Sequence, residues 1–312
     1  MHNKNINYKQ EKYFINPTIV HSPYWLITID LDGTLLKTPS KEDLLKNIPN
    51  YDINPLNIKV LKKLIDKGHK VAIVTGRPWR DTEEVYKKIG LRTVVANYNG
   101  ASIHNPNDEG FLPYTSAMNR KYFDGLLNRT SIKKYFKNFV VECYDTTYIL
   151  DATDKELLNK FHIHYGPKVI EISKDFALPI NPQSLIFKLE PKKDFNKSAL
   201  LIELKRKYGE TFLFRYWDAL DGKDFVYLEV NTKSITKGSA LQFISSYYNI
   251  PISNTIAFGD GENDLEMLEA AAVGVAMRNA SEVVKSHAKD VTNLTNDEGG
   301  VGDYLESFFK LK

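Results

Sequence analysis

The 312-residue sequence has a single cysteine, Cys143, and this scarcity excludes several kinds of protein. One cysteine cannot form a disulfide within the chain, and it cannot supply the ligand set of a structural zinc site. Low cysteine usage fits a reducing compartment. Because Cys143 lies in an apolar, strand-like segment, we expect a buried thiol rather than a nucleophile.

Long apolar runs are also absent. No stretch approaches the ~20 apolar residues of a transmembrane helix. Residues 1–23 are polar and contain no apolar segment of the length found in a signal peptide. These absences predict a cytoplasmic protein without a membrane partner. We treat residues 1–23 as an N-terminal extension, to which the sequence assigns no role.

Neither sign of charge dominates, because 42 Lys and Arg residues stand against 39 Asp and Glu residues. A net charge of +3 gives no reason to expect a nucleic-acid partner. Hydrophobic residues make up 42% of the chain, enough to bury a core without disulfides. The length suits one large domain or two smaller ones, and it indicates no particular oligomeric state.

Buried strands alternate with helices at both ends of the chain. Asn54 and Pro55 are typical of a helix cap followed by proline at the first helical position. The alternation predicts an α/β fold with a Rossmann-like, doubly wound parallel sheet. The expected strands are 24–29, 69–74, 93–96, 254–258 and 273–276; the expected helices are 55–67, 79–89, 237–248, 263–271 and one at the C-terminus.

The pattern between residues 102 and 228 is different and predicts an inserted α+β domain. The catalytic core is then formed by residues 24–101 and 229–312. The insertion has strands and helices of its own, so it can bury its own core. Its expected strands are 139–150, 184–189, 212–217 and 225–230, and its expected helices lie near 119–127, 155–161 and 195–208.

Three strand ends carry polar motifs, and open α/β sheets bind ligands at the carboxyl ends of their strands. These motifs are residues 30–34 (DLDGT), 75–77 (TGR) and 259–264 (GDGEND), and a fourth, 237–238 (KG), begins a helix. The carboxylates among them would repel one another, so a hard cation such as Mg²⁺ is expected there. A phosphate ester would be balanced by the metal, Lys237, the hydroxyls of Thr34 and Thr75, and backbone N–H groups near Gly33 and Gly76.

Two carboxylates in the first motif can divide the work of phosphoryl transfer. One attacks phosphorus, since carboxylates are established nucleophiles in this chemistry. The other protonates the leaving oxygen and later accepts a proton from water. Asp30 held on a metal stays ionised, while Asp32 away from it can carry a proton.

The four motifs, in this order, resemble those of the haloacid dehalogenase superfamily. Residues 99–101 (NGA), 274–277 (GVAM) and 279–280 (NA) resemble its Cof-type subgroup, whose α/β cap of type IIB is inserted between the second and third motifs. The resemblance extends from about Tyr24 to the C-terminus, and the cap matches only in size and position. It implies a phosphatase with a Rossmann-like core and an inserted cap.

The resemblance also implies a role for individual residues. Asp30 would be the nucleophile and a metal ligand, and Asp32 the general acid and base, with its backbone carbonyl on the metal. Asp260 would bind Mg²⁺, with Asp264 supporting the metal shell. Residues Thr75, Lys237 and Asn263 would lie at the phosphate, while Arg278 departs from a glycine common in the family.

Several side chains keep two interpretations. Arg77 contacts either the substrate or cap, or pairs with a carboxylate, and Asn99 is either near the site or a turn residue. His162 and His164 are expected to be structural or solvated. Five aromatic residues of the cap either pack in its core or line the face that meets the substrate. They are Tyr144, Tyr148, Phe187, Tyr216 and Trp217.

The sequence therefore predicts a phosphatase that acts on a small phosphorylated metabolite, either a sugar phosphate or a phosphorylated cofactor. A phosphomutase using the same aspartyl-phosphate is an alternative, since only the acceptor differs. A non-catalytic protein that binds a phosphorylated metabolite is another, although a pure binder has no need of Asp32.

Overall fold

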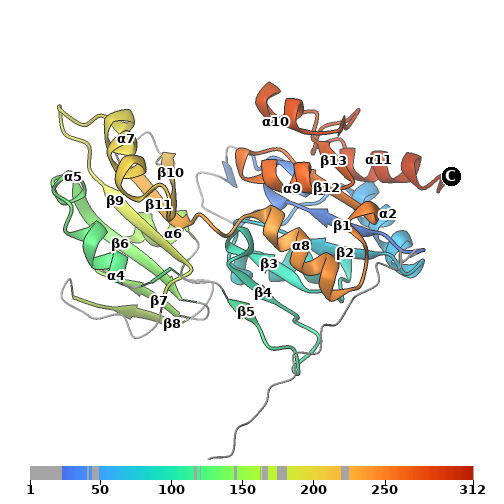
Figure 1. Ribbon diagram of the computed structural model, residues 1–312, viewed down its shortest axis with the longest axis horizontal. Coiled ribbons are helices and arrows are strands. Elements are labelled where there is room, and N and C mark those ends of the chain that lie inside the picture. Colours follow the sequence, from blue (N-terminus) through green and yellow to red (C-terminus); the bar gives the residue numbers. More distant parts are fainter. Residues whose placement is uncertain are drawn as a thin grey trace, which may run out of the picture.

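A five-stranded parallel sheet forms the centre of one half of the computed structural model (Figure 1). Its strands lie in the order β14, β13, β12, β1 and β2, so strands from the end of the chain pair directly with β1. The bounds are β1 Leu26–Ile29, β2 Lys70–Ile73, β12 Thr255–Gly259, β13 Val273–Ala276 and β14 Asp290–Val291. The structure describes residues 23–40, 42–43, 49–115, 118–119, 121–143, 146–161, 163, 168–173, 181–218 and 225–311.

Helices cover both faces of this sheet, which confirms the doubly wound α/β fold. Buried side chains of α2, α3 and α11 form one apolar cluster with the sheet, and those of α8, α9 and α10 form another on the opposite face. The bounds are α2 Pro55–Asp66, α3 Glu83–Ile89, α8 Lys237–Tyr247, α9 Leu265–Ala270, α10 Glu282–His287 and α11 Gly300–Phe308.

The helix α2 begins where the sequence predicts. The Asn54 side chain accepts a hydrogen bond from the backbone N–H of Leu56, and Pro55 occupies the first helical position. The helix predicted over 79–89 is, however, divided into a short 3₁₀ helix η2 (Trp79–Asp81) and α3. The division falls at Thr82, whose hydroxyl donates to the Pro78 carbonyl at 2.9 Å.

The cap contains a six-stranded sheet in the order β10, β11, β9, β6, β7 and β8. The helices α4, α5 and α7 pack with one face of this sheet, and α6 packs against the other. Cys143 is buried in the cap, as predicted. The bounds are β6 Phe136–Cys143, β7 Thr146–Ile149, β8 Lys168–Glu171, β9 Ser184–Leu189, β10 Phe212–Asp218, β11 Val226–Thr232, α4 Lys121–Leu127, α5 Thr130–Lys133, α6 Lys155–Lys160 and α7 Lys197–Tyr208.

The single strand predicted over 139–150 is wrong, because this segment contributes to two antiparallel strands. Val140 pairs with Ile149 and Cys143 with Thr146, so β6 and β7 form a hairpin. The segment contains neither glycine nor proline, which are the two strongest turn signals.

A small antiparallel sheet lies beside the parallel one. Its strands are β3 (Val95–Asn97), β4 (Ser102–His104) and β5 (Tyr114–Thr115), and a parallel bridge between Val74 and Ala96 links it to the main sheet. The pairing of β4 with β3 continues past residue 101, and β11 of the cap sheet runs on to Thr232. The domain boundaries at 101/102 and 228/229 stay predictions.

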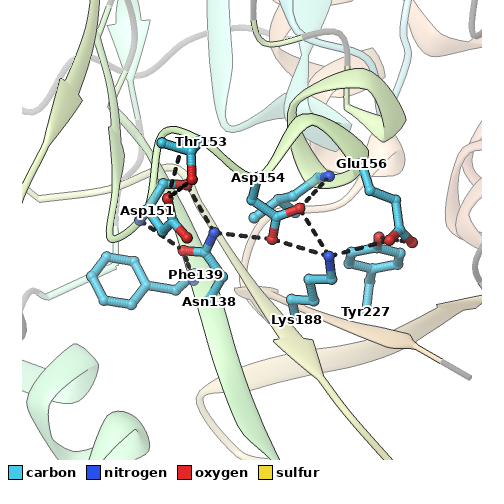
Figure 2. A network of polar contacts seen from close by, with 9 residues as sticks. Asn138, Phe139, Asp151, Thr153, Asp154, Glu156, Lys188 and Tyr227 are labelled. Carbon is cyan, nitrogen blue, oxygen red and sulfur yellow. Dashed lines mark hydrogen bonds and ion pairs between the residues drawn. The ribbon is translucent and has the colours of Figure 1, made fainter.

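The α6 helix is held on the cap sheet by a polar network (Figure 2). The Lys188 ammonium lies 2.9 Å from Asp154 and 3.3 Å from Glu156, and Tyr227 donates its hydroxyl to Glu156 at 2.9 Å. Asp154 also caps the helix by accepting the backbone N–H of Leu157. Because the Lys188 side chain is only 6% exposed, this ion pair fixes the helix where little water reaches it.

The buried ring of His104 gives the core a pH dependence. It meets the Trp79 ring edge-on at 4.8 Å, and desolvation lowers the pKa of His104 from 6.5 to about 4. The unfolded chain then binds more protons than the folded one between these values, so stability falls as the pH drops through this window.

Between about pH 7 and about pH 4.5, we expect the free energy of unfolding of the wild type to fall by about 2 kcal/mol more than that of His104→Gln, measured by urea unfolding. Parallel stability curves for the two proteins would contradict this expectation.

Candidate active site

Asp30 follows the last residue of β1 at the centre of the parallel sheet. Its side chain is buried, and the Lys237 ammonium lies 2.7 Å from its Oδ1. The same ammonium lies 2.7 Å from Oδ1 of Asp264, so one buried cation bridges two buried carboxylates. Lys237 is the first residue of α8, where Thr236 and Ser239 form a capping box.

Asp260 and Asp264 come from the turn after β12. Thr34 donates its hydroxyl to Asp260 at 2.9 Å. Asp264 accepts the backbone N–H groups of Asp260 and Gly261 at 3.1 and 3.0 Å. Oxygen atoms of Asp30, Asp260 and Asp264 lie within 4.8 Å of one another. These three residues, each predicted from its place after a strand of the parallel sheet, thus lie close together.

Burial dominates the electrostatics of this cluster. Desolvation, opposed by the charge of Lys237 and reinforced by the charge of Asp264, raises the pKa of Asp30 to about 8. Desolvation and the charge of Asp264 raise the pKa of Asp260 to about 6. The charge of Lys237 therefore does not offset the burial and mutual repulsion of these carboxylates. Three clustered carboxylates whose negative charge is not balanced are suited to bind a hard divalent cation such as Mg²⁺.

Gly33 makes the turn between the two aspartates of the first motif. Its φ of +71° lies in the left-handed region, and a Cβ there would lie 2.1 Å from Oδ2 of Asp260. The Gly33 carbonyl accepts a hydrogen bond from Asn279 at 2.7 Å. Asn279 therefore holds the motif loop, a contact that sequence reasoning missed. The neighbouring Arg278 donates instead to the Asn293 carbonyl.

Asp32 does not join the three-carboxylate cluster. Its side chain is 62% exposed and forms a two-point pair with Arg77, with N–O distances of 2.7 and 2.6 Å. Arg77 is itself fixed, because its Nη1 donates to the carbonyls of Asn50 and Asp81 at 3.0 and 3.1 Å. Of the two interpretations of Arg77, the pairing with a carboxylate is the one seen here, and the pair lies on the wall of a cavity.

The second motif and Asn99 lie beside this cluster. Thr75 is buried after β2, and its hydroxyl accepts the backbone N–H of Arg77 at 3.2 Å. Asn99 belongs to the 3₁₀ helix η3 (Tyr98–Gly100) with a φ of +57°, and it accepts a hydrogen bond from the Asn263 amide at 3.0 Å. A Cβ on Gly76 would lie 3.4 Å from Asn99 Oδ1, so the backbone passes close to this amide.

A cavity of about 600 Å³ lies between the core and the cap. Its floor includes Asp30 and Asp260, and the cap supplies much of the opposite wall. The lining residues from the cap are Glu142, Lys160, Phe161, Ser184, Ile186, Arg215, Trp217 and Glu229. Only Trp217 was among the candidates from the sequence.

The other candidate residues of the cap have different places. Tyr148, Phe187 and Tyr216 pack in the apolar cluster on the far face of the cap sheet. Tyr144, His162 and His164 lie outside the described residues.

A buried ion pair joins the core to the cap at the edge of the cavity. Arg80 of η2 pairs with Glu142 of β6 at 2.6 and 3.1 Å, and both side chains are almost fully buried. Glu142 also accepts the hydroxyls of Tyr98 and Thr147 at 3.1 and 3.0 Å, and Arg80 donates to the Phe161 carbonyl at 3.0 Å. Sequence reasoning missed this network, because Arg80 and Glu142 are 62 residues apart and belong to no shared motif.

None of the helices in the described ranges is long and apolar enough to span a membrane. The model of a sequence family described as haloacid dehalogenase-like hydrolase matches residues 27–305. The 5-amino-6-(5-phospho-D-ribitylamino)uracil phosphatase YitU of Bacillus subtilis is 31% identical, and the match covers 93% of this chain and 98% of YitU.

Solved structures show the same fold. The phosphatase BT1666 from Bacteroides thetaiotaomicron superposes with a TM-score of 0.69 at 25% identity, covering 92% of this chain and 95% of BT1666. The subclass IIB sugar phosphatase BT4131 gives a TM-score of 0.69 at 24% identity, with 91% and 99% coverage. The family resemblance drawn from the four motifs is thus confirmed. The chain belongs to the haloacid dehalogenase-like hydrolase family, among the phosphatases of that family.

Proposed function

We propose that the protein is a Mg²⁺-dependent phosphatase that hydrolyses small phosphorylated metabolites through an aspartyl-phosphate on Asp30. One observation carries this proposal. Asp30 lies at the floor of a cavity shared by core and cap, in contact with Lys237 and clustered with Asp260 and Asp264. This set combines a nucleophile, a fixed cation and a cation-binding cluster at one place.

The residues suited to hold Mg²⁺ are Asp30, Asp260 and Asp264, and the backbone carbonyl of Asp32 stays a predicted further ligand. When bound, the ion supplies the positive charge that the carboxylates and the substrate phosphate require. The remaining binding groups for the phosphoryl oxygens are the Lys237 ammonium, the Thr75 hydroxyl, the Asn263 amide and backbone N–H groups at Gly33 and Gly76.

The chain's own residues then carry both chemical steps. An Asp30 oxygen forms a bond to phosphorus while the bond from phosphorus to the leaving oxygen breaks. Asp32 gives the leaving oxygen its proton. In the second step a water oxygen attacks phosphorus, Asp32 takes a proton from that water, and the bond to Asp30 breaks. Inorganic phosphate leaves and both aspartates return to their starting states.

The pair with Arg77 gives Asp32 a fixed place for this role. Two hydrogen bonds hold its carboxylate at the cavity wall, outside the cluster that surrounds Asp30. Groups that divide acid and nucleophile roles need different environments. Asp30 is buried beside Lys237, whereas Asp32 is largely exposed and paired with Arg77, so the two carboxylates lie in different environments.

The test is turnover of p-nitrophenyl phosphate by the full chain, followed by a screen of sugar phosphates and phosphorylated cofactors. We expect phosphate release with Mg²⁺, loss of release with EDTA, and recovery when excess Mg²⁺ is added. Release that continues unchanged in EDTA would overturn the metal requirement. With glucose 6-phosphate, free phosphate indicates hydrolysis, whereas an isomer without phosphate release would indicate the phosphomutase.

A further inference from the structure

One face of the cap sheet looks into the cavity. Ile186 of β9 pairs with Glu229 of β11, and Glu229 pairs with Arg215 of β10. Paired residues on neighbouring strands point to the same face, and Trp217 shares it because it follows Arg215 by two positions. All four residues line the cavity.

The α6 helix covers another part of this face. Lys188 follows Ile186 by two positions, and Tyr227 precedes Glu229 by two, so both lie on the same face as the cavity wall. Figure 2 shows Lys188 and Tyr227 bound to Asp154 and Glu156, which fix α6 over them. The part of this face that lines the cavity thus has α6 along one side. We call its residues Arg215, Trp217 and Glu229 the cap platform.

Trp217 presents a large apolar ring to the cavity. Its side chain is 46% exposed, which is unusual for tryptophan. Its indole N–H donates to Glu229 Oε2 at 2.8 Å, so the ring orientation is fixed before any ligand arrives. A fixed and accessible indole is suited to stack against a flat ring.

Arg215 places a cation beside this indole. Within the part of the chain that the structure describes, it forms an ion pair with no carboxylate, and its cross-strand neighbour Glu229 is bonded to Trp217. A guanidinium offers five donors in a plane. In the cavity these donors match acceptor oxygens on the edge of a ligand.

We propose that the cap platform binds the leaving group of the substrate and selects a planar, conjugated ring with oxygen acceptors on its edge. The ring stacks on Trp217, and Arg215 donates to its carbonyl oxygens. This inference rests on the proposed phosphatase function, because the phosphate end of the same molecule must reach Asp30. It assigns the ligand's ring to the cap and its phosphate to the core.

A matched pair of ligands tests the ring directly. Uridine 5′-monophosphate and ribose 5-phosphate share the phosphate and the sugar, and only the first carries a planar ring with carbonyl oxygens. Riboflavin 5′-phosphate and ribitol 5-phosphate form a second pair with a longer linker. Each is measured as a competitor of p-nitrophenyl phosphate turnover, so inhibition constants are obtained whether or not the competitor is itself hydrolysed.

In the wild type we expect the ring-bearing member of at least one pair to bind about 10-fold more tightly or better, since stacking on an aromatic side chain gives effects of this size. Trp217→Leu should reduce this ratio to about 1–2, whereas Trp217→Phe should keep much of it because the ring remains. Arg215→Gln should weaken the ring-bearing ligand by about 10-fold and leave the ringless one unchanged. Arg206→Gln, at an exposed position on α7, is the matched control and should change neither.

The failures can be told apart. If p-nitrophenyl phosphate is not turned over at all, the proposed function fails and this inference fails with it. If it is turned over but both pairs give ratios near one, or neither competitor inhibits, only the cap platform is overturned. A ratio that is high but unchanged in Trp217→Leu would overturn it as well.

Discussion

Replacing Asp30 with Asn should lower p-nitrophenyl phosphate turnover by about 10⁴-fold or more, because an amide oxygen cannot form the phosphoryl-enzyme bond. The folded state should survive the change. Ionised Asp30 is costly in the metal-free protein, since burial raises its pKa to about 8. The neutral amide removes that cost, and Lys237 keeps Asp264 as its partner. We therefore expect the metal-free Tm of Asp30→Asn near neutral pH to equal or exceed that of the wild type.

Asp32→Asn is the control that separates the two roles. The p-nitrophenolate ion leaves readily without a proton, so the first step should continue and the second should become slow. Rapid mixing should then show one equivalent of p-nitrophenol released in a burst, followed by slow turnover. A burst from Asp30→Asn, or steady turnover of Asp32→Asn at the wild-type rate, would contradict the assignment of these aspartates.

Replacing Lys237 with Met should remove both activity and much of the stability of the metal-free protein. The ammonium is fully buried and lies 2.7 Å from oxygens of both Asp30 and Asp264. Removing one partner of a buried pair leaves uncompensated charge and costs about 3–5 kcal/mol. The measurement is urea unfolding in EDTA at about pH 8, and the same measurement with excess Mg²⁺ should show a smaller loss.

The stability lost in Lys237→Met should also be smaller at low pH, because the charge on Asp30 depends on pH. Its folded pKa of about 8 lies above the ordinary value, so below that pH the folded state takes up a proton and the charge on Asp30 is removed. Lys155→Met provides a matched control, since Lys155 is the exposed first residue of α6. Equal losses for the two variants would show that burial between carboxylates does not matter at Lys237.

The core of the site could be predicted because its signals are local. Asp30, Thr75 and Asp260 each follow a buried strand, and parallel strands end at the same edge of a sheet. Lys237 is different, since a lysine at a helix start carries little information by itself. Only the order of the motifs along the chain placed it beside Asp30.

The cap wall could not be predicted, because it depends on pairing between distant strands. Trp217 and Glu229 meet through the register of β10 on β11, where Trp217 opposes Tyr227. No local pattern encodes that register. The contact of Asp32 with Arg77 joins residues 45 positions apart, and nothing in either motif distinguishes it from a contact with substrate.

The Arg80–Glu142 pair has a consequence for any movement between core and cap. It lies at the junction of core and cap, and both side chains are shielded from solvent. Any swing of the cap that widens the entrance separates them and must hydrate a guanidinium and a carboxylate together. Separating core and cap at this junction therefore carries a hydration cost, and that cost is set by two residues that also line the cavity.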